Sequence, residues 1–427
     1  MTTTAGDASR RSQYSREILA EGKDMKVVGP WMLVVVGILG APVWQQARAE
    51  ERNFEIYGFA QADYIQDTKR VAPDWQDAFR PSKIAVPEGF YGSNGQASVS
   101  VKQSRFGVKG AVPTGDSTPP INFKFEFDFF GTGVDAGQTT IRLRHFYGEW
   151  GQLLAGQTHS LFMDIDVFPN VIDYWGPPGM VFLRLPQIRW TAYRTANDTV
   201  AVAIERPGND VDAGNLRLVQ GFENADVRAD QTVPDLTGQY RHDDTWGHYQ
   251  VSAILRRVGY EYSLNGEPFQ KGNQTGWGVN LAGAYKTIGK DQLLLQVVYG
   301  DGIASYMNDG GMDIAPQTLP SGPPGNLGVG SKAVPLTGIV AYYDHYWNSS
   351  LSSSIGYSFT KVDNSDLQET TAFHKGQYAS TNLLWYPADK VMIGGELMWG
   401  KLTDRDGTTG DDVRFQFSVK YNFGTKL

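Results

Sequence analysis

The chain lacks cysteine altogether, and basic residues are outnumbered by acidic ones. Its 427 residues include 38 Lys and Arg against 46 Asp and Glu, a formal net charge of -8. Without thiols it can form no disulfide scaffold, thiolate metal site or cysteine nucleophile. No nucleic-acid partner is expected at this net charge, because phosphate binding needs a basic surface. Long apolar runs are missing after the first fifty residues, and the mean hydropathy is -0.35, which excludes a polytopic helical membrane protein.

Glycine and aromatic residues are abundant instead. The chain has 49 Gly, 21 Tyr, 21 Phe and 11 Trp. So many aromatic side chains exclude intrinsic disorder, and this composition favours β-structure. No complete nucleotide-binding loop, serine-hydrolase elbow or zinc-protease motif occurs, so the sequence predicts no enzyme, no cofactor and no metal site.

The N-terminal segment has the features of an export signal. Met25 and Lys26 precede an apolar run over residues 27–43, and the small-residue pattern Ala47-Arg48-Ala49 follows. This order predicts a signal peptide cleaved after Ala49, with residues 1–49 as extension and signal and 50–427 as the mature chain. The alternative is a transmembrane helix, although the run is short and interrupted by proline. Residues 1–24 are either an extended n-region or the product of an upstream start codon.

The mature chain alternates apolar and polar residues with period two. At positions 121, 123, 125, 127 and 129 stand Ile and four Phe, whereas positions 122–128 between them carry Asn, Lys, Glu and Asp. Residues 413–423 and 391–399 alternate in the same way. Such runs form strands with one apolar and one polar face. The apolar faces are long and aromatic, and the polar faces carry charged groups. This combination favours strands that face lipid outside and water inside.

Sixteen segments fit this description, and their connectors alternate between short and long. That pattern predicts an all-β, antiparallel, up-and-down transmembrane barrel of 16 strands with short periplasmic turns and long outer loops. Aromatic residues flank several short turns and predict an interfacial girdle: Trp150, Trp246, Tyr346, Trp347, Trp385, Tyr386 and Phe423. The segments lie near residues 53–66, 96–112, 119–130, 138–150, 152–159, 187–195, 199–206, 235–243, 247–260, 275–287, 291–300, 334–344, 349–362, 375–386, 389–401 and 412–423.

Several of these segments resemble those of Gram-negative porins. Residues 56–63 (IYGFAQAD) resemble the first porin strand, 104–110 (SRFGVKG) the second, and 144–157 the hairpin that leads to the constriction loop. The loop segment 173–179 (DYWGPPG) is most similar to the DcaP-like porin subfamily. One departure is that Gly424 to Leu427 follow Phe423, whereas porin chains end on the final aromatic residue. Another is that only residues 50–52 precede the first strand, so a helical segment found in some DcaP-like chains is missing.

The resemblance implies a homotrimer in the outer membrane of a Gram-negative bacterium, in contact with lipid and lipopolysaccharide. It further implies passive uptake of small anionic solutes such as dicarboxylates. A sixteen-stranded barrel leaves an aqueous lumen, so selectivity requires an inward loop and charged wall residues. The loop 160–186 is the candidate constriction. Because it is strongly apolar, it is expected to pack against the inner wall or a neighbouring subunit.

The candidate site residues follow from this loop and from strand parity. The loop carries Asp164, Asp166 and Asp173. Arginine forks suit planar carboxylates, so an arginine track across the lumen would serve anions. The same arginines could instead neutralise the loop's own acids, and both interpretations stay open. The basic residues predicted on the pore wall are Arg105, Lys109, Lys124, Arg142, Arg144, Arg189, Arg414 and Lys420.

Three other functions remain as alternatives to an anion-preferring channel. In a general or cation-preferring porin, the three loop aspartates would dominate the field. An outer-membrane barrel enzyme would need a Ser/His pair near the outer girdle, and none can be assigned. A soluble exported β-protein that binds sugars would also show alternation, with its apolar face inside.

Overall fold

The computed structural model describes residues 53–320 and 327–426, so the predicted signal segment and its cleavage site lie outside the described residues. The helices in the described part are single 3-10 turns, and none has the length or apolar character to cross a membrane. They are η1 (Pro73–Trp75), η2 (Pro81–Lys83), η3 (Gly133–Asp135), η4 (Ile165–Val167), η5 (Leu216–Leu218) and η6 (Ala304–Tyr306).

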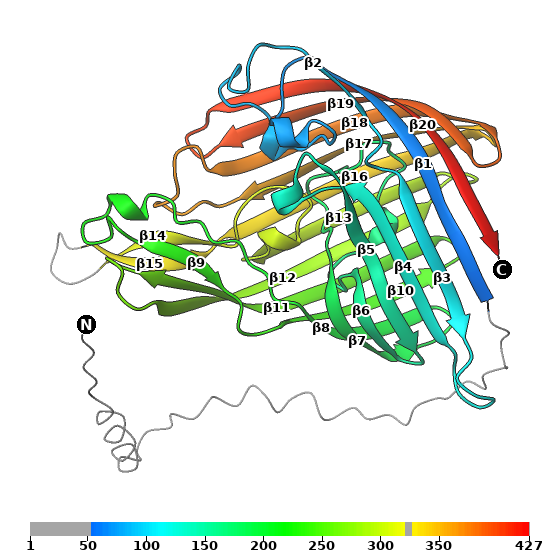
Figure 1. The fold of residues 1–427 in the computed structure, drawn as a ribbon, viewed down its shortest axis with the longest axis horizontal. Helices are drawn as coiled ribbons and strands as arrows, with labels where there is room; N and C mark the ends of the chain where they lie inside the picture. Colours follow the sequence, from blue (N-terminus) through cyan, green and yellow to red (C-terminus); the bar gives the residue numbers. More distant parts are fainter. Residues whose placement is uncertain (1–52, 321–326, 427) are drawn as a thin grey trace, which may run out of the picture. The chain divides into compact units, whose positions relative to one another are not determined.

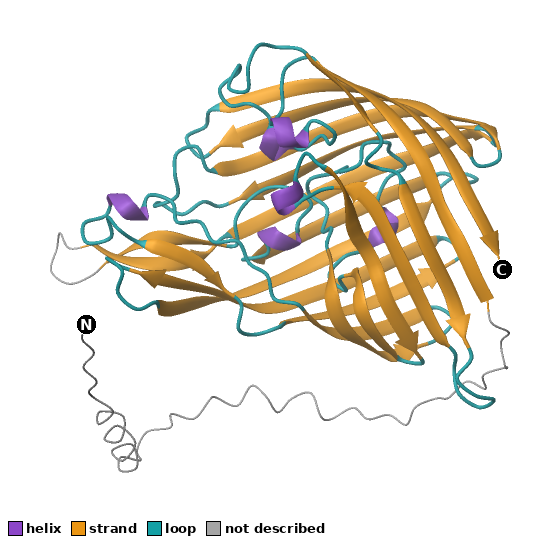
Figure 2. Ribbon diagram, in the orientation of Figure 1, coloured by secondary structure: helices purple, strands orange, loops and turns teal. Residues whose placement is uncertain are grey.

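Strands make up most of the described chain (Figure 2). Their bounds are β1 (Asn53–Asp67), β2 (Gln96–Ser100), β3 (Arg105–Val112), β4 (Ile121–Phe130), β5 (Thr139–Trp150), β6 (Leu153–His159), β7 (Arg184–Arg194), β8 (Asp198–Glu205), β9 (Asp226–Asp230), β10 (Asp235–Asp244), β11 (Gly247–Ser263), β12 (Gln270–Lys286), β13 (Gln292–Asp301), β14 (Ile314–Pro320), β15 (Leu327–Ala333), β16 (Pro335–Asn348), β17 (Leu351–Val362), β18 (Phe373–Ala388), β19 (Val391–Asp404) and β20 (Thr409–Lys426).

The strands form a closed antiparallel barrel in which neighbours in sequence are neighbours in the sheet (Figure 1). The last strand closes it, since β20 pairs with β1 from Asp67↔Arg414 to Glu55↔Lys426. The barrel has sixteen strands, which confirms the predicted number. Both β2 and β3 pair with β1, so the predicted segment 96–112 is a single barrel strand interrupted between Ser100 and Arg105.

Three short strands were not predicted from the sequence. Strand β9 pairs with the far end of β11, and β14 pairs with β15 in a separate hairpin. The DVRAD sequence of β9 has no apolar alternation. Proline in β14 and glycine in β15 weaken strand propensity, so tertiary contacts help to hold this hairpin in place. One of them is the Gln274 side chain of β12, which donates to the Ser331 carbonyl oxygen and to Ser331 Oγ, at 3.0 Å each.

Side chains are distributed as predicted for a barrel in lipid. On β20, Phe415 and Phe417 point outward and are 44% and 42% exposed. The residues that alternate with them, Arg414, Gln416 and Ser418, are fully buried. The lumen therefore receives the polar face of this strand. The girdle prediction fails at Tyr386, which packs inside on Ile172 and Leu384, because its hydroxyl accepts a hydrogen bond from a loop asparagine.

Part of the lumen is filled by an apolar core, and the inner loop (residues 160–183) contributes much of it. Phe162 and Met180 of this loop are buried against Leu294, Val298 and other inward residues of β11 to β19. The core also contains residues of the segment 302–313 and of the first long loop, residues 68–95. The expectation that the inner loop packs against the inner wall is therefore confirmed.

The glycine that ends the Gly-Pro-Pro-Gly motif allows the inner loop to lie directly on the strands. A Cβ atom at Gly179 would stand 2.2 Å from the Phe359 carbonyl oxygen and 2.5 Å from that of Ile339. Gly179 also donates its N–H to Ser358 Oγ (2.9 Å) and accepts from Gln296 Nε2 (3.0 Å). Only a residue without a side chain can approach β16 and β17 this closely.

Candidate functional site

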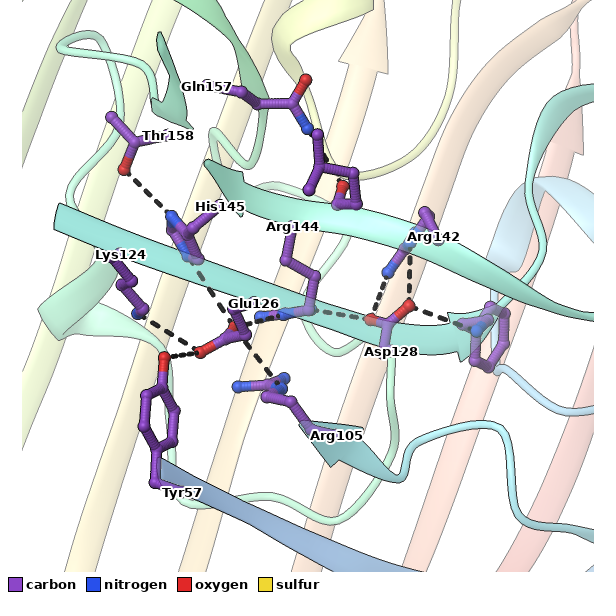
Figure 3. Close-up of polar contacts among 12 residues, drawn as sticks. Tyr57, Arg105, Lys124, Glu126, Asp128, Arg142, Arg144, His145, Gln157 and Thr158 are labelled. Atoms are coloured by element: carbon purple, nitrogen blue, oxygen red, sulfur yellow. Dashed lines mark hydrogen bonds and ion pairs between the residues drawn. The ribbon is translucent and has the colours of Figure 1, made fainter. Parts of the chain in front are cut away.

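Charged side chains gather on the inner wall where β3, β4 and β5 run side by side (Figure 3). Alternation directs Glu126 and Asp128 of β4 into the lumen, because the phenylalanines between them face outward. Register then places Arg105 of β3 and Arg142 of β5 on either side of Asp128. The connections over residues 113–120 and 131–138 bring these three strands together in sequence order.

Asp128 is held by two arginines of β5. Arg142 binds it in a bidentate manner, with Nε 3.1 Å from Oδ1 and Nη2 2.8 Å from Oδ2. Arg144 Nη1 donates to the same Oδ2 atom at 3.0 Å, and its Nε donates to Glu126 Oε1 at 2.7 Å. Bidentate, charge-assisted contacts of this kind fix the planes of the groups they join. Arg144 thus bridges the two carboxylates.

Glu126 contacts two further cations, Lys124 and Arg105. Lys124 Nζ lies 3.3 Å from Oε2, Arg105 Nε lies 3.6 Å from Oε1, and the Tyr57 hydroxyl donates to Oε2 at 2.8 Å. We call Arg105, Lys124, Glu126, Asp128, Arg142 and Arg144 the basic cluster. It contains four cations and two carboxylates, so an excess of positive charge faces the lumen.

A bulge in β5 turns two successive residues toward this cluster. The β4–β5 register shifts between Glu126 and Phe127, and Arg144 and His145 are both buried although strict alternation would separate them. His145 Nδ1 lies 3.0 Å from Thr158 Oγ1, and its Nε2 lies 3.9 Å from Glu126. Parity from sequence assigned Arg142 and Arg144 to one face and left His145 out, since a bulge leaves no mark in the pattern.

The inner loop reaches the basic cluster through an aromatic residue. Tyr174 donates its hydroxyl to Asp128 and accepts from Arg144 Nη1 at 3.1 Å. Its ring stacks on Phe130, with centroids 4.1 Å apart and planes 6° from parallel. The loop and the basic wall are therefore in direct contact.

The three predicted loop aspartates lie away from the basic cluster. Asp164 is buried and contacts Arg241 Nη1 (3.2 Å) and His248 Nε2 (2.7 Å), and Asp166 pairs with the same arginine at 2.8 Å. Asp173 accepts from the backbone N–H groups of Phe79 (3.0 Å) and Gly176 (2.8 Å). Burial raises the pKa of Asp173 to about 6.

The loop acids and the arginines of the basic cluster therefore do not neutralise one another, because Asp164 and Asp166 pair with Arg241 of β10 instead. Asp164, Asp166 and His248 place ligand atoms within 4.8 Å of one another, a spacing that could suit a cation. The guanidinium of Arg241 already supplies positive charge there, so the cluster does not require a metal.

The other predicted wall residues have separate surroundings. Lys109 pairs with Glu55 at 3.3 Å on an exposed part of β3. Lys420 lies over the Phe59 ring, 5.1 Å from its centroid. Arg189 donates to Gln187 Oε1 (3.0 Å) and to the His159 carbonyl oxygen (2.6 Å). Arg414 is fully buried against Asp67, with contacts of 2.5 and 2.9 Å. These four residues do not join the basic cluster.

Removal of Arg414 is expected to weaken the barrel seam. The Arg414–Asp67 ion pair joins β20 to β1. Arg414→Ala would leave the Asp67 carboxylate buried without its partner. Breaking a buried ion pair in this way costs about 3–5 kcal/mol. Equilibrium unfolding in urea, followed by the loss of heat-modifiable migration on gels, would measure the change. Arg228→Ala, at an exposed pair with Asp226, is the matched control and should change stability little.

Sequence reasoning overlooked the acidic partners of the arginines. Glu126 and Asp128 were recognised as inward residues of a strand but were not paired with Arg142 and Arg144 of the next strand. Counting residues back from the short turn at residue 151 does not predict which arginine lies opposite which carboxylate, because the bulge in β5 shifts the β4–β5 register. Tyr174, Arg241 and His248 were also overlooked, since their contacts join segments far apart in sequence.

Comparison with known proteins gives the same architecture. A family model described as DcaP outer membrane protein matches residues 78–312. The crystal structure of the outer membrane channel DcaP of Acinetobacter baumannii is 21% identical, with a TM-score of 0.69, over 88% of this chain and 99% of that one. No curated protein sequence matched the chain.

Two other solved porins share the fold at lower identity. An anion-selective porin from Comamonas acidovorans is 9% identical, with a TM-score of 0.55, over 87% of this chain and 100% of that one. OmpF of Salmonella typhi, in complex with daunomycin, is also 9% identical, with a TM-score of 0.53 and coverage of 89% and 100%. The family match and the barrel fold point to an outer-membrane channel rather than to an enzyme.

Proposed function

The chain belongs to the DcaP outer membrane protein family, and on that premise we propose that its channel favours small anions, with dicarboxylates as the expected solutes. The observation that supports this proposal is the composition of the basic cluster. Four cations from three adjacent strands surround two carboxylates on the lumen wall. An excess of positive charge beside a low-dielectric wall attracts anions and repels cations.

The three aspartates of the inner loop support a cation-preferring channel less well than the basic cluster supports an anion-preferring one. Asp164 and Asp166 share Arg241, and Asp173 is buried and satisfied by backbone N–H groups. Paired and buried carboxylates contribute little field to an aqueous path. The acidic net charge of the whole chain is also a poor guide, since exposed charges are screened beyond about 10 Å in ordinary salt.

We further propose that the mature chain begins after Ala49 and assembles as a homotrimer in contact with lipid and lipopolysaccharide. A continuous aromatic surface on the outside of β3 to β5 supports such contacts. It includes Phe106, Phe125, Phe127 and Phe146, with neighbouring ring centroids 5.6–5.8 Å apart. Mass analysis of the purified protein and chemical cross-linking in native membranes test both statements.

Ion selectivity tests the proposed function directly. Purified protein is inserted into a planar bilayer under a KCl gradient, and the zero-current potential is recorded. An anion-directed potential supports the proposal. A cation-directed potential would overturn it and assign the field to the loop acids. Silence from folded, heat-modifiable protein would mean a closed barrel and would reopen the enzyme alternative.

A further inference from the structure

Two cations on the lumen wall are not hydrogen-bonded to any carboxylate in the part of the chain that the structure describes. Lys420 of β20 also takes part in no ion pair among these described residues. Arg105 of β3 forms one ion pair there, in which its Nε atom lies 3.6 Å from Glu126 Oε1, too far for a hydrogen bond (Figure 3). Arg142 and Arg144 differ, because carboxylates of β4 accept hydrogen bonds from both guanidinium groups.

Both side chains reach the lumen. On β20, Lys420 has the same parity as the inward Arg414, and on β3, Arg105 lies opposite the inward Asp128. The Arg105 side chain is 26% exposed, and Lys420 is also partly exposed. Of their nitrogen atoms, Arg105 Nε is the one that is shielded from solvent without a partner, so Lys420 Nζ and the Arg105 Nη atoms keep accessible surface. Because this surface lies on the inner face of the barrel, a solute in the lumen can contact it.

An aromatic ring of β1 holds the two cations near each other. Phe59 lies directly opposite Arg105 in the β1–β3 register, and Lys420 is opposite Gln61, the next inward residue of β1. The centroid of the Phe59 ring is 5.2 Å from Arg105 Cζ and 5.1 Å from Lys420 Nζ. The two positive charges therefore lie within about 10 Å of each other, and both are attracted to the ring.

The carboxylates near these cations are already engaged. Asp63 attracts Lys420 but forms no ion pair with it. Neutral side chains donate hydrogen bonds to the Asp63 carboxylate, namely Gln61, Gln103, Gln416 and Ser418. Glu126 is bound by Lys124, Arg144 and the Tyr57 hydroxyl. Neither carboxylate can turn toward Lys420 without leaving these buried donors unsatisfied, which is costly, whereas an anion in the lumen breaks no such bond.

A dicarboxylate matches two cations at this separation. A charged nitrogen binds a carboxylate oxygen at about 2.8 Å, so succinate can reach both cations at once, whereas acetate binds one at a time. A guanidinium holds one carboxylate through its planar fork, and an ammonium group holds the other as a point charge. We propose that Arg105 and Lys420 form a two-point site for dicarboxylates on the lumen wall. This inference rests on the proposed function and names the residues that distinguish dicarboxylates from other small anions.

The two-point site and the basic cluster have separate roles, although Arg105 belongs to both. The basic cluster supplies the excess charge that draws anions inward. Lys420 lies outside the cluster and binds the second carboxylate, so it can be replaced without removing a charge from the cluster. Lys109 provides a matched control: its Nζ atom lies 5.2 Å from the centroid of the Tyr57 ring, but Glu55 already pairs with it at 3.3 Å.

The experiment measures how anions inhibit chloride current through the full mature channel in planar bilayers. Succinate, acetate and sulfate are added separately, and the concentration for half-maximal inhibition is determined for each. Sulfate carries two charges, as succinate does, but holds them in one compact group. The variants are Lys420→Gln, Lys420→Arg and the control Lys109→Gln. Heat-modifiable migration verifies that each variant is folded, and the zero-current potential under a KCl gradient gives its ion selectivity.

We expect succinate to inhibit the wild type at concentrations about tenfold lower than acetate, because a second charge-assisted contact contributes a factor of that order. Lys420→Gln should remove most of this preference, while the zero-current potential stays anion-directed because the basic cluster is intact. Lys420→Arg keeps the charge and should retain the preference. Lys109→Gln should change the ratio of the two concentrations by less than about twofold, since exposed, paired charges contribute little.

The contrary outcomes separate the two-point site from the proposed function. Equal effects of Lys420→Gln and Lys109→Gln would overturn the site, because the loss of lumen charge would then explain both. Inhibition by sulfate that is as strong as that by succinate, and equally weakened in Lys420→Gln, would also overturn it, since charge and not span would then be recognised. An anion-selective wild type that succinate and acetate inhibit equally would overturn the site and leave the function intact. A cation-selective wild type would overturn the function itself.

Discussion

Replacement of Arg142 and Arg144 together by alanine is expected to turn the ion preference of the channel toward cations. Both residues are held against the lumen wall by Asp128, and Arg144 also binds Glu126. Their removal takes away two positive charges and exposes two carboxylates in the same place. The net charge of the basic cluster then falls from +2 to zero, since two cations and two carboxylates remain.

The size of the effect follows from electrostatics in a partly screened lumen. Charges about 4 Å apart near a protein surface interact by a few kcal/mol, and 1.4 kcal/mol corresponds to a factor of ten. The ratio of chloride to potassium permeability should therefore fall about tenfold. Zero-current potentials under a KCl gradient measure it.

The opposite change should come from Asp128→Asn, which removes one of the two carboxylates and keeps every arginine. This variant should become more anion-selective than the wild type. The pair of variants separates charge from structural damage, because disordered cluster geometry alone would not give shifts of opposite sign. Unchanged potentials in the double arginine variant would show that the basic cluster does not control permeation.

Glu205→Ala is expected to release the inner loop from the barrel wall. The Glu205 carboxylate at the end of β8 accepts four hydrogen bonds, from Ser160 Oγ (2.8 Å), Leu161 N (3.0 Å), Thr237 Oγ1 (2.8 Å) and the Tyr306 hydroxyl (3.2 Å). It joins the start of the inner loop to β10 and to the segment 302–313. Each buried donor left without an acceptor costs about 1–3 kcal/mol.

The released loop should increase current noise and change single-channel conductance. Limited proteolysis within residues 160–183 should also become faster, because cleavage follows local opening. Glu149→Ala is the matched control: it removes a wall carboxylate that pairs with Arg194 at 3.7 Å and is not bound to the loop. Quiet currents and slow cleavage in Glu205→Ala would show that the apolar core alone fixes the loop.

The strand pattern contained enough information for the architecture, because period two is a local property. Alternation over 121–129 and 413–423 identified strands and their outward faces without any long-range contact. The alternation of short and long connectors then set the even number of strands. Where local signals were absent, as in β9 and the β14–β15 hairpin, the prediction failed, since those strands depend on neighbours rather than on their own sequence.

The sequence predicted which charged residues contribute to the site, but not how they pair. The sequence identified the arginines of β5 and the aspartates of the inner loop, but it left open whether they neutralise one another. The structure answers this, because Arg142 and Arg144 bind Glu126 and Asp128, whereas Asp164 and Asp166 bind Arg241. Pairing between segments depends on register, and the β5 bulge alters register by a single residue.

By itself, the sequence determined that this protein is a sixteen-stranded barrel with an apolar exterior and a polar lumen, because hydrophobic alternation acts over a few residues. Only the tertiary structure decided which charges face each other across that lumen. It also decided that Arg414 pairs with Asp67 where β20 closes the barrel on β1, instead of joining the basic cluster. Coulombic and hydrogen-bond energies fall steeply with distance, and in a closed barrel those distances are set by strand register and loop packing.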